Sequence, residues 1–172
     1  VNPNFKTKVI WASTWYDPAK EADAAKALID QGCDIITQHT DSAAALQAAE
    51  QRGVFAFGQA SDMSSFAPKA HLTAIVDDWS GYYISRVKAA MEGTWKSGDV
   101  WGGIKDNMVK IAPYNDAVTP AARTAAGEVS RGIFSGTAHP FTGELKDQKG
   151  VVRLKAGETA SDELMSKMDW YV

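Results

Sequence analysis

Three aspartates follow three short apolar runs in the first third of the chain, where they could hold a ligand. Asp17, Asp41 and Asp62 each come shortly after one run, and the runs are Lys8–Ala12, Asp34–Gln38 and Val54–Gly58. A carboxylate that accepts hydrogen bonds from ligand N–H or hydroxyl groups gives orientation in an apolar cleft. Aspartate also caps helices and starts turns, and this alternative stays open for Asp17 and Asp41. Asp62 has no obvious helix behind it, which favours a binding role there.

Trp15 could supply the apolar surface of the same site. It lies among Ser, Thr and Asp rather than within an apolar run, whereas we expect most of the six tryptophans to be packing residues. An indole ring beside acceptor groups suits a flat heterocycle or a sugar. Stacking on an aromatic side chain is worth ~1 to 3 kcal/mol per base in nucleic-acid complexes.

A second acidic pair, Asp77 and Asp78, precedes Trp79. Adjacent residues of an extended segment point to opposite sides, so at most one of the two carboxylates faces a given cleft. The alternative is that the pair starts the helix predicted from Ser80.

The elements that position these residues alternate between strand and helix. Asp17 followed by Pro18 predicts a helix start, and Gly32 predicts its end. A second, alanine-rich helix is predicted to end at Gly53. Strands that alternate with helices indicate βαβ units and a parallel sheet, which binds ligands outside the carboxyl ends of its strands. The predicted fold class is therefore α/β.

Later segments extend this pattern. The expected elements are a surface loop at Ser61–Pro68, a strand at Leu72–Val76, a helix from Tyr82 that ends at Gly93, a strand broken by a turn and then a second strand within Trp101–Ile111, a helix from Pro120 to Ile133 that stops at Gly136, a hairpin within Pro140–Arg153 and a helix that starts at Ser161.

Composition narrows the function classes. The 172 residues suffice for one domain or for a domain with an appended element, and the net charge of −3 gives no basic footprint for nucleic acid. No apolar run approaches the ~20 residues needed to span a bilayer.

The chain starts without Met, which suggests a processing event or a longer polypeptide. Cys33 is expected to be a small core residue.

Catalytic and metal sites find little support. His39, His71 and His139 lie in three different segments, there is no Gly-x-Ser-x-Gly motif, and no His, Cys or carboxylate pair has metal-ligand spacing. We therefore expect neither an enzyme nor a cofactor.

Several separated segments together resemble the basic membrane protein family, the solute-binding lipoproteins of bacterial ABC transporters. Several members take purine nucleosides or related purines. The resemblance covers nearly the whole of this chain but only about the second half of a family member. The segments that carry it are Trp15–Glu21, Ala48–Glu50, Leu72–Val76, Tyr82–Tyr83, Gly93–Trp95, Trp101–Asp106 and Met168–Trp170.

The resemblance implies a type I periplasmic-binding-protein fold, in which two α/β lobes hold the ligand in a cleft between them. Residues 1–76 would form the core of the C-terminal lobe, residues 77–98 a helix of the other lobe and hinge, and residues 99–172 the return strands and C-terminal helices. The implied partners are a small-molecule ligand, a membrane permease and the N-terminal lobe of the same protein. The implied location is the periplasm or the cell envelope, with the membrane reached only through a lipid anchor or the permease.

The resemblance also implies roles for individual residues. Trp15 stands where the family places the ring that stacks on the purine, and Thr40 and Asp41 lie in a loop that gives backbone contacts. Asp62 belongs to an acidic pair whose first position is Ala60 here.

At the sugar end, Asp77 stands where many members have a lysine associated with the ribose. An acceptor in place of a cationic donor predicts a preference for a purine base such as adenine over a nucleoside. Asp78 and Trp79 complete the predicted ligand site.

Two alternatives remain at this point. A receiver-like signalling module would use aspartates at strand ends to bind magnesium and accept phosphate, and it predicts a five-stranded doubly wound unit. A purine-nucleoside-processing enzyme would need a phosphate site or a competent base beside the heterocycle.

Overall fold

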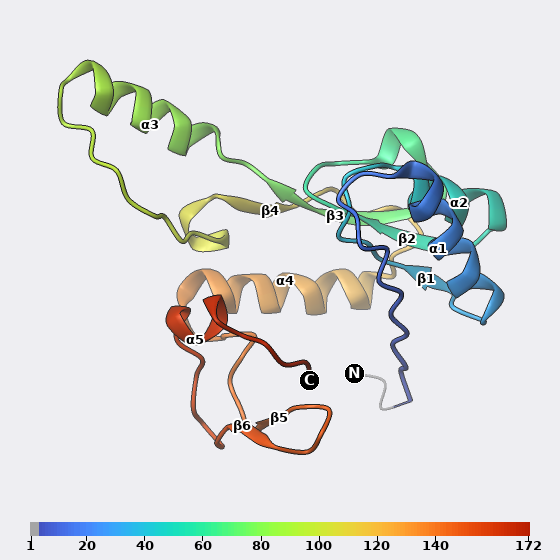
Figure 1. Cartoon of the computed structure of the whole chain (residues 1–172). Helices are drawn as coiled ribbons and strands as arrows, with labels where there is room; N and C mark the ends of the chain where they lie inside the picture. Colours follow the sequence, from blue (N-terminus) through green and yellow to red (C-terminus); the bar gives the residue numbers. More distant parts are fainter. Residues whose placement is uncertain (1–3) are drawn as a thin grey trace.

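The computed structural model describes residues 4–172 and contains one four-stranded sheet with the order β1-β2-β3-β4 (Figure 1). Strands β1 (Ile35–Ile36), β2 (Phe55–Gly58) and β3 (His71–Asp77) are parallel. Strand β4 (Val109–Ile111) adds to β3 in the antiparallel direction. The predicted α/β class is confirmed.

Helix α1 (Pro18–Asp30) begins and ends where its sequence predicts. The Asp17 side chain accepts from the backbone N–H of Lys20, Pro18 occupies the first turn, and Gly32 has a φ of +87° just after the helix. Helix α2 (Ala44–Arg52) ends on Gly53, whose left-handed φ of +69° costs a glycine little.

The core lies where α1 and α2 pack against each other and α2 packs on β1 and β2. Small side chains dominate it and allow close approach of the helices, and Leu46 is its largest fully buried side chain. The other members are Ala25, Ile36, Ala45, Ala48, Ala49, Ala56, Met63, Ala67 and Ala70.

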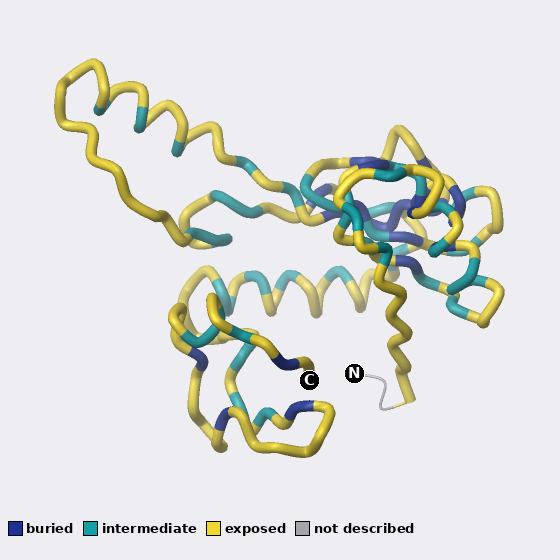
Figure 2. Tube along the Cα trace, viewed as in Figure 1, coloured by how far each residue is buried: buried dark blue, intermediate teal, exposed yellow. Residues whose placement is uncertain are grey.

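Helix α3 (Ser80–Met91) projects away from the sheet, and none of its residues is buried (Figures 1 and 2). The chain then returns through the short helix η2 (Ile104–Asp106) to β4. Asn115 fixes the chain after β4 to the core, because its N–H donates to Leu72 O at 2.8 Å and its side-chain amide donates to Pro68 O at 3.0 Å.

The C-terminal part consists of α4 (Pro120–Ser135), the hairpin β5 (Leu145–Lys146) and β6 (Val152–Leu154), and α5 (Asp162–Ser166). Asp147 is buried in the hairpin, where it accepts from the backbone N–H groups of Lys149 and Val151 and from Arg153. The predicted helix from Pro120, its stop at Gly136 and the hairpin are confirmed.

The prediction of a strand at Lys8–Ala12 is wrong, since this segment forms no strand in the structure. Its contacts come from side chains: Lys8 Nζ donates to Gln31 O at 2.7 Å, and the Trp11 ring lies 5.8 Å from that of Tyr171. The edge strand β1 has only two residues, so it offers few backbone groups with which Lys8–Ala12 could pair.

Two further expectations also differ from the structure. Residues 101–103 form no strand, and Met108 packs against Gly102, where an added Cβ would lie 2.4 Å from its Sδ. The segment Ser61–Pro68 contains the 3-10 helix η1 (Ser64–Phe66) and buries Met63 and Ala67, so it is more than a surface loop.

The tryptophans also differ from expectation. Of the six, only Trp170 is buried at 8% exposure, and the others are exposed by 46% or more. Exposure alone therefore does not distinguish Trp15.

No helix among residues 4–172 is both long and apolar enough to cross a membrane.

Candidate functional site

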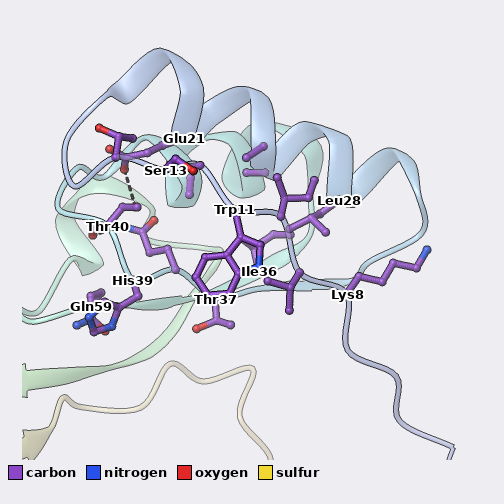
Figure 3. A pocket seen from close by; sticks show the side chains of 18 of the residues that line it. Lys8, Trp11, Ser13, Glu21, Leu28, Ile36, Thr37, His39, Thr40 and Gln59 are labelled. Atoms are coloured by element: carbon purple, nitrogen blue, oxygen red, sulfur yellow. Dashed lines mark hydrogen bonds between the residues drawn. The ribbon is translucent and has the colours of Figure 1, made fainter. Parts of the chain in front are cut away.

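A pocket of about 860 Å³ lies between the N-terminal segment and the units α1 and β1 (Figure 3). Residues 7–15 form one wall, and Ala24, Ala25, Leu28 and Ile36 contribute to an apolar floor. Trp11 and Trp15, exposed by 71% and 69%, both line it. The pocket therefore combines two open indole rings with an apolar surface, which suits a planar apolar molecule.

Polar groups line one edge of the pocket. His39, Thr40 and Gln59 all belong to the lining of this pocket (Figure 3). The rings of His39 and Trp15 are 5.9 Å apart and tilted by 60°. These side chains can donate and accept hydrogen bonds from a heterocycle held against the indole ring.

The loops that carry Trp15 and Thr40 are joined directly. The backbone N–H of Asp41 donates to Trp15 O at 2.9 Å. This bond places Asp41 beside Trp15, but only Trp15 and Thr40 line the pocket, and Asp41 and Asp17 do not. Asp17 lies in the same region, but its side chain is used to cap α1.

Glu21 forms a second link between these loops. Its Oε1 accepts from Asp17 N–H at 2.9 Å, and its Oε2 accepts from the hydroxyls of Thr40 at 2.8 Å and Ser42 at 2.6 Å. Glu21 is only 3% exposed. Burial by itself raises the pKa of Glu21, but the hydrogen bonds from Ser42, Asp17 and Thr40 outweigh it and hold the pKa below its ordinary value.

Asp62 and Asp77 lie outside the pocket lining. They flank Ala60, whose carbonyl accepts from Asp77 N–H at 2.9 Å. Asp62 Oδ1 accepts from the backbone N–H of Ser64 at 3.0 Å, which lowers the pKa of Asp62. The short helix η1 follows Asp62, so the expectation that no helix follows this residue is wrong.

Asp62 also lies beside a buried histidine. His71 is 2% exposed, its Nε2 is 3.9 Å from Asp62 Oδ1, and burial lowers the pKa of this imidazole.

Asp78 and Trp79 stand at the start of α3, away from Trp15. Asp78 accepts from Ser80 Oγ at 2.5 Å and pairs with Lys110, and this lysine is the main reason that the pKa of Asp78 falls to about 2. Asp78 thus binds Ser80, the first residue of α3, as expected if the acidic pair starts this helix. Trp79 is half exposed and packs its ring 6.3 Å from that of Tyr83.

A second, smaller pocket of about 460 Å³ lies beside Asp78 and Lys110 and is lined mainly by polar side chains. Asp78 is the only predicted site residue that lines it.

The sequence reasoning missed Trp11, Glu21, His39 and Gln59 as parts of the pocket. Glu21 had one local signal, since an acidic residue in the first turn of a helix often binds the backbone N–H at the cap. No local signal could place His39 and Gln59 together, because they follow different strands.

Among residues 4–172, no group of three or more His, Cys, Asp or Glu side chains is arranged to hold a metal ion.

A family model and two curated relatives match most of this chain. Residues 1–129 match the family described as Bmp, ABC transporter substrate-binding protein PnrA-like. A purine-binding protein of Brucella abortus (strain 2308) is 56% identical over 172 residues, which cover 100% of this chain and 49% of the relative. A Haloferax volcanii protein that carries the name of an ABC transporter glucose-binding protein is 31% identical over 165 residues, which cover 96% of this chain and 39% of that relative.

Solved structures show the same fold at low identity. A transcriptional activator of the comK gene from Bacillus halodurans has a TM-score of 0.67 at 20% identity, covering 74% of this chain and 46% of its own. An ABC transporter solute-binding protein from Conexibacter woesei has a TM-score of 0.62 at 22% identity, covering 80% and 47%.

The chain thus spans half or less of the length of the curated relatives it matches. The family match over residues 1–129 extends from the N-terminal segment through the sheet and into α4. On this evidence the chain belongs to the Bmp family of ABC transporter substrate-binding proteins.

Proposed function

We propose that the protein is the ligand-binding component of an ABC importer and that its ligand is a purine. The observation that carries this proposal is the exposed ring of Trp15 in the lining of an apolar pocket. A purine is flat and apolar on its faces and carries donors and acceptors at its edges. It matches an indole ring bordered by His39, Thr40 and Gln59.

Within the purines, we propose that a free base such as adenine binds more tightly than a nucleoside. Asp77 is an acceptor at the position that the family resemblance links with the ribose. Asp62 and Asp78 would be the other carboxylates that hold amine or hydroxyl groups. The name of the Brucella abortus relative supports the ligand class and does not distinguish base from nucleoside.

The whole protein would hold its ligand between two lobes. In this arrangement residues 1–76 and 99–172 belong to one lobe, and residues 77–98 belong to the other lobe and hinge. Closure of the lobes would bury the ligand and present the closed surface to a membrane permease, with the protein located outside the cytoplasmic membrane. The family description, a substrate-binding protein of a transporter, supports this reading over an enzyme or a signalling module.

Titration calorimetry of the full-length protein tests the proposal. Adenine, adenosine, guanosine and glucose are titrated under one buffer condition, and adenine is expected to bind most tightly. Tighter binding of the nucleosides would contradict the preference for a base. If only glucose binds, the ligand is a sugar and not a purine, since sugars also stack on indole rings.

A further inference from the structure

Glu21 is the only buried carboxylate among the described residues that line the main pocket. The two loops that it joins carry Trp15 and Thr40, which lie far apart in the sequence. We propose that Glu21 is a positioning residue that holds Trp15 in the orientation needed to bind the ligand. This inference rests on the proposed function for its ligand and on the structure for its contacts.

Glu21 lies at the centre of a hydrogen-bond network. The Glu21 cluster, defined as Asp17, Glu21, Thr40 and Ser42, contains three hydrogen bonds to one carboxylate, from one backbone N–H and two hydroxyls. The dashed line in Figure 3 marks the bond from Thr40. Ser42 is 6% exposed. The buried Ser42 hydroxyl therefore loses water on folding and needs the carboxylate as its acceptor, and the partly buried Asp17 N–H and Thr40 hydroxyl share that acceptor.

Few other contacts hold Trp15. Its ring is 69% exposed and pairs only with His39 among the ring contacts of the described residues. Its backbone O accepts from the N–H of Asp41. Asp41 stands between Thr40 and Ser42 of the Glu21 cluster, and Trp15 is two residues before Asp17. Loosening the cluster would free both residue 15 and residue 41.

The loop at residues 40–42 is also held by Gln38. Gln38 Nε2 donates to Thr40 O at 3.0 Å and to Ser42 O at 2.6 Å. The loop at 40–42 is thus fixed independently of Glu21. Through its hydrogen bonds to both loops, Glu21 then fixes the segment that carries Trp15 relative to this loop.

The test compares Glu21→Ala with Glu21→Gln in the full-length protein. A glutamine can accept from Asp17 N–H through its oxygen and donate to the rotatable hydroxyls of Thr40 and Ser42. We expect Glu21→Ala to weaken adenine binding by about tenfold or more and Glu21→Gln to stay within about threefold of wild type. Asp23→Ala is the matched control, since Asp23 is an exposed carboxylate of the same helix, and its affinity should equal that of wild type.

A ligand-independent measurement accompanies the titrations. Hydrogen exchange of the Asp41 amide, followed by NMR, should speed up by about tenfold in Glu21→Ala while the Val54 amide, which donates to Ala49 O, keeps its protection. Equal acceleration of both amides would mean general loss of stability and would overturn the positioning role.

The remaining outcomes also decide the question. Unchanged adenine affinity in Glu21→Ala contradicts the proposal, and so does a loss in Glu21→Gln as large as in Glu21→Ala, which would indicate direct contact of the charge with ligand. If Glu21→Ala does not fold, Ser42→Ala removes one donor, and unchanged affinity and Asp41 exchange in that variant refute the inference. Failure of wild type to bind any purine refutes the proposed function instead, and the Asp41 exchange then still reports on Glu21.

Discussion

At the scale of single residues, Trp15 and its neighbour Tyr16 offer a direct comparison. Both side chains are about two-thirds exposed in the same loop, yet only Trp15 lines the pocket. An exposed aromatic ring gains stability only when something covers it. The position of the ring, rather than its exposure, is therefore what supports the proposed ligand contact of Trp15.

Replacing Trp15 by alanine should weaken adenine binding by about 1 to 3 kcal/mol, the range found for a base stacked on an aromatic side chain. Calorimetry with the full-length protein measures this change. Tyr16→Ala is the control and should leave the dissociation constant unaltered. Equal losses in the two variants would show that the loop, and not the indole ring, determines affinity.

Asp78 pairs with Lys110 at the start of α3. Hydrogen bonds first from Lys110 and then from Ser80 lower the pKa of Asp78 from 3.8 to about 2. Because the folded-state pKa lies below the unfolded value, the stability that this carboxylate contributes is present above pH 3.8 and is lost as the pH falls toward 2.

Lys110→Met should raise the pKa of Asp78 toward 3.8, and an NMR titration of the Asp78 carboxylate measures it. Lys105→Met is a nearby control with the same loss of charge, and it should leave the titration of Asp78 as in wild type. A pKa of Asp78 that does not move in Lys110→Met would mean that Ser80 alone holds the carboxylate.

At the scale of elements, the close approach of β2 and β3 depends on Gly58. A Cβ at this position would lie 2.8 Å from Ala74 Cβ and 2.9 Å from His71 Nε2, and both neighbours are buried. At these distances the added methyl group would force one of the two buried side chains, or the backbone, to shift. The glycine thus sets the packing directly before Gln59, which borders the pocket.

Gly58→Ala should therefore lower the free energy of unfolding by about 1 to 3 kcal/mol, as overpacking in a core does. Denaturant unfolding measures the change. Gly81→Ala is the comparison, because a Cβ there meets no atom within 4 Å and alanine favours the helix α3. It should be neutral or stabilising by about 0.5 to 1 kcal/mol. Similar losses in both variants would contradict the packing argument.

At the scale of the whole molecule, the sheet and α1–α2 form a packed body, whereas α3 stands apart from it (Figure 2). Apolar side chains of α3 are open to solvent, and Tyr83, Ile84, Val87 and Met91 are exposed by 56% to 83%. Contiguous exposed apolar surface favours association.

Residues 1–172 produced alone should consequently associate at micromolar concentrations, and sedimentation velocity measures this. Val87→Glu should shift the population toward monomer because it places a charge in the apolar row. Lys88→Glu is the control, since Lys88 is an exposed polar neighbour on the same helix. A monomeric wild-type chain would show that the α3 surface does not drive association.

Local sequence determined most helix boundaries. Asp17 with Pro18, and the glycines at positions 53, 93 and 136, mark helix ends that the structure reproduces, because caps and left-handed turns depend on residues adjacent in the chain. The parallel arrangement of β1, β2 and β3 follows from the same alternation of strands and helices.

Only the tertiary structure decided which residues meet. Lys8–Ala12 has strand composition but forms no strand, and Asp62 engages Ser64 and approaches His71 rather than lining the pocket. Glu21 joins loops about twenty residues apart, which no local pattern encodes. Pairing of strands and burial of carboxylates depend on partners distant in the chain, so the sequence specifies the elements while their packing specifies the pocket.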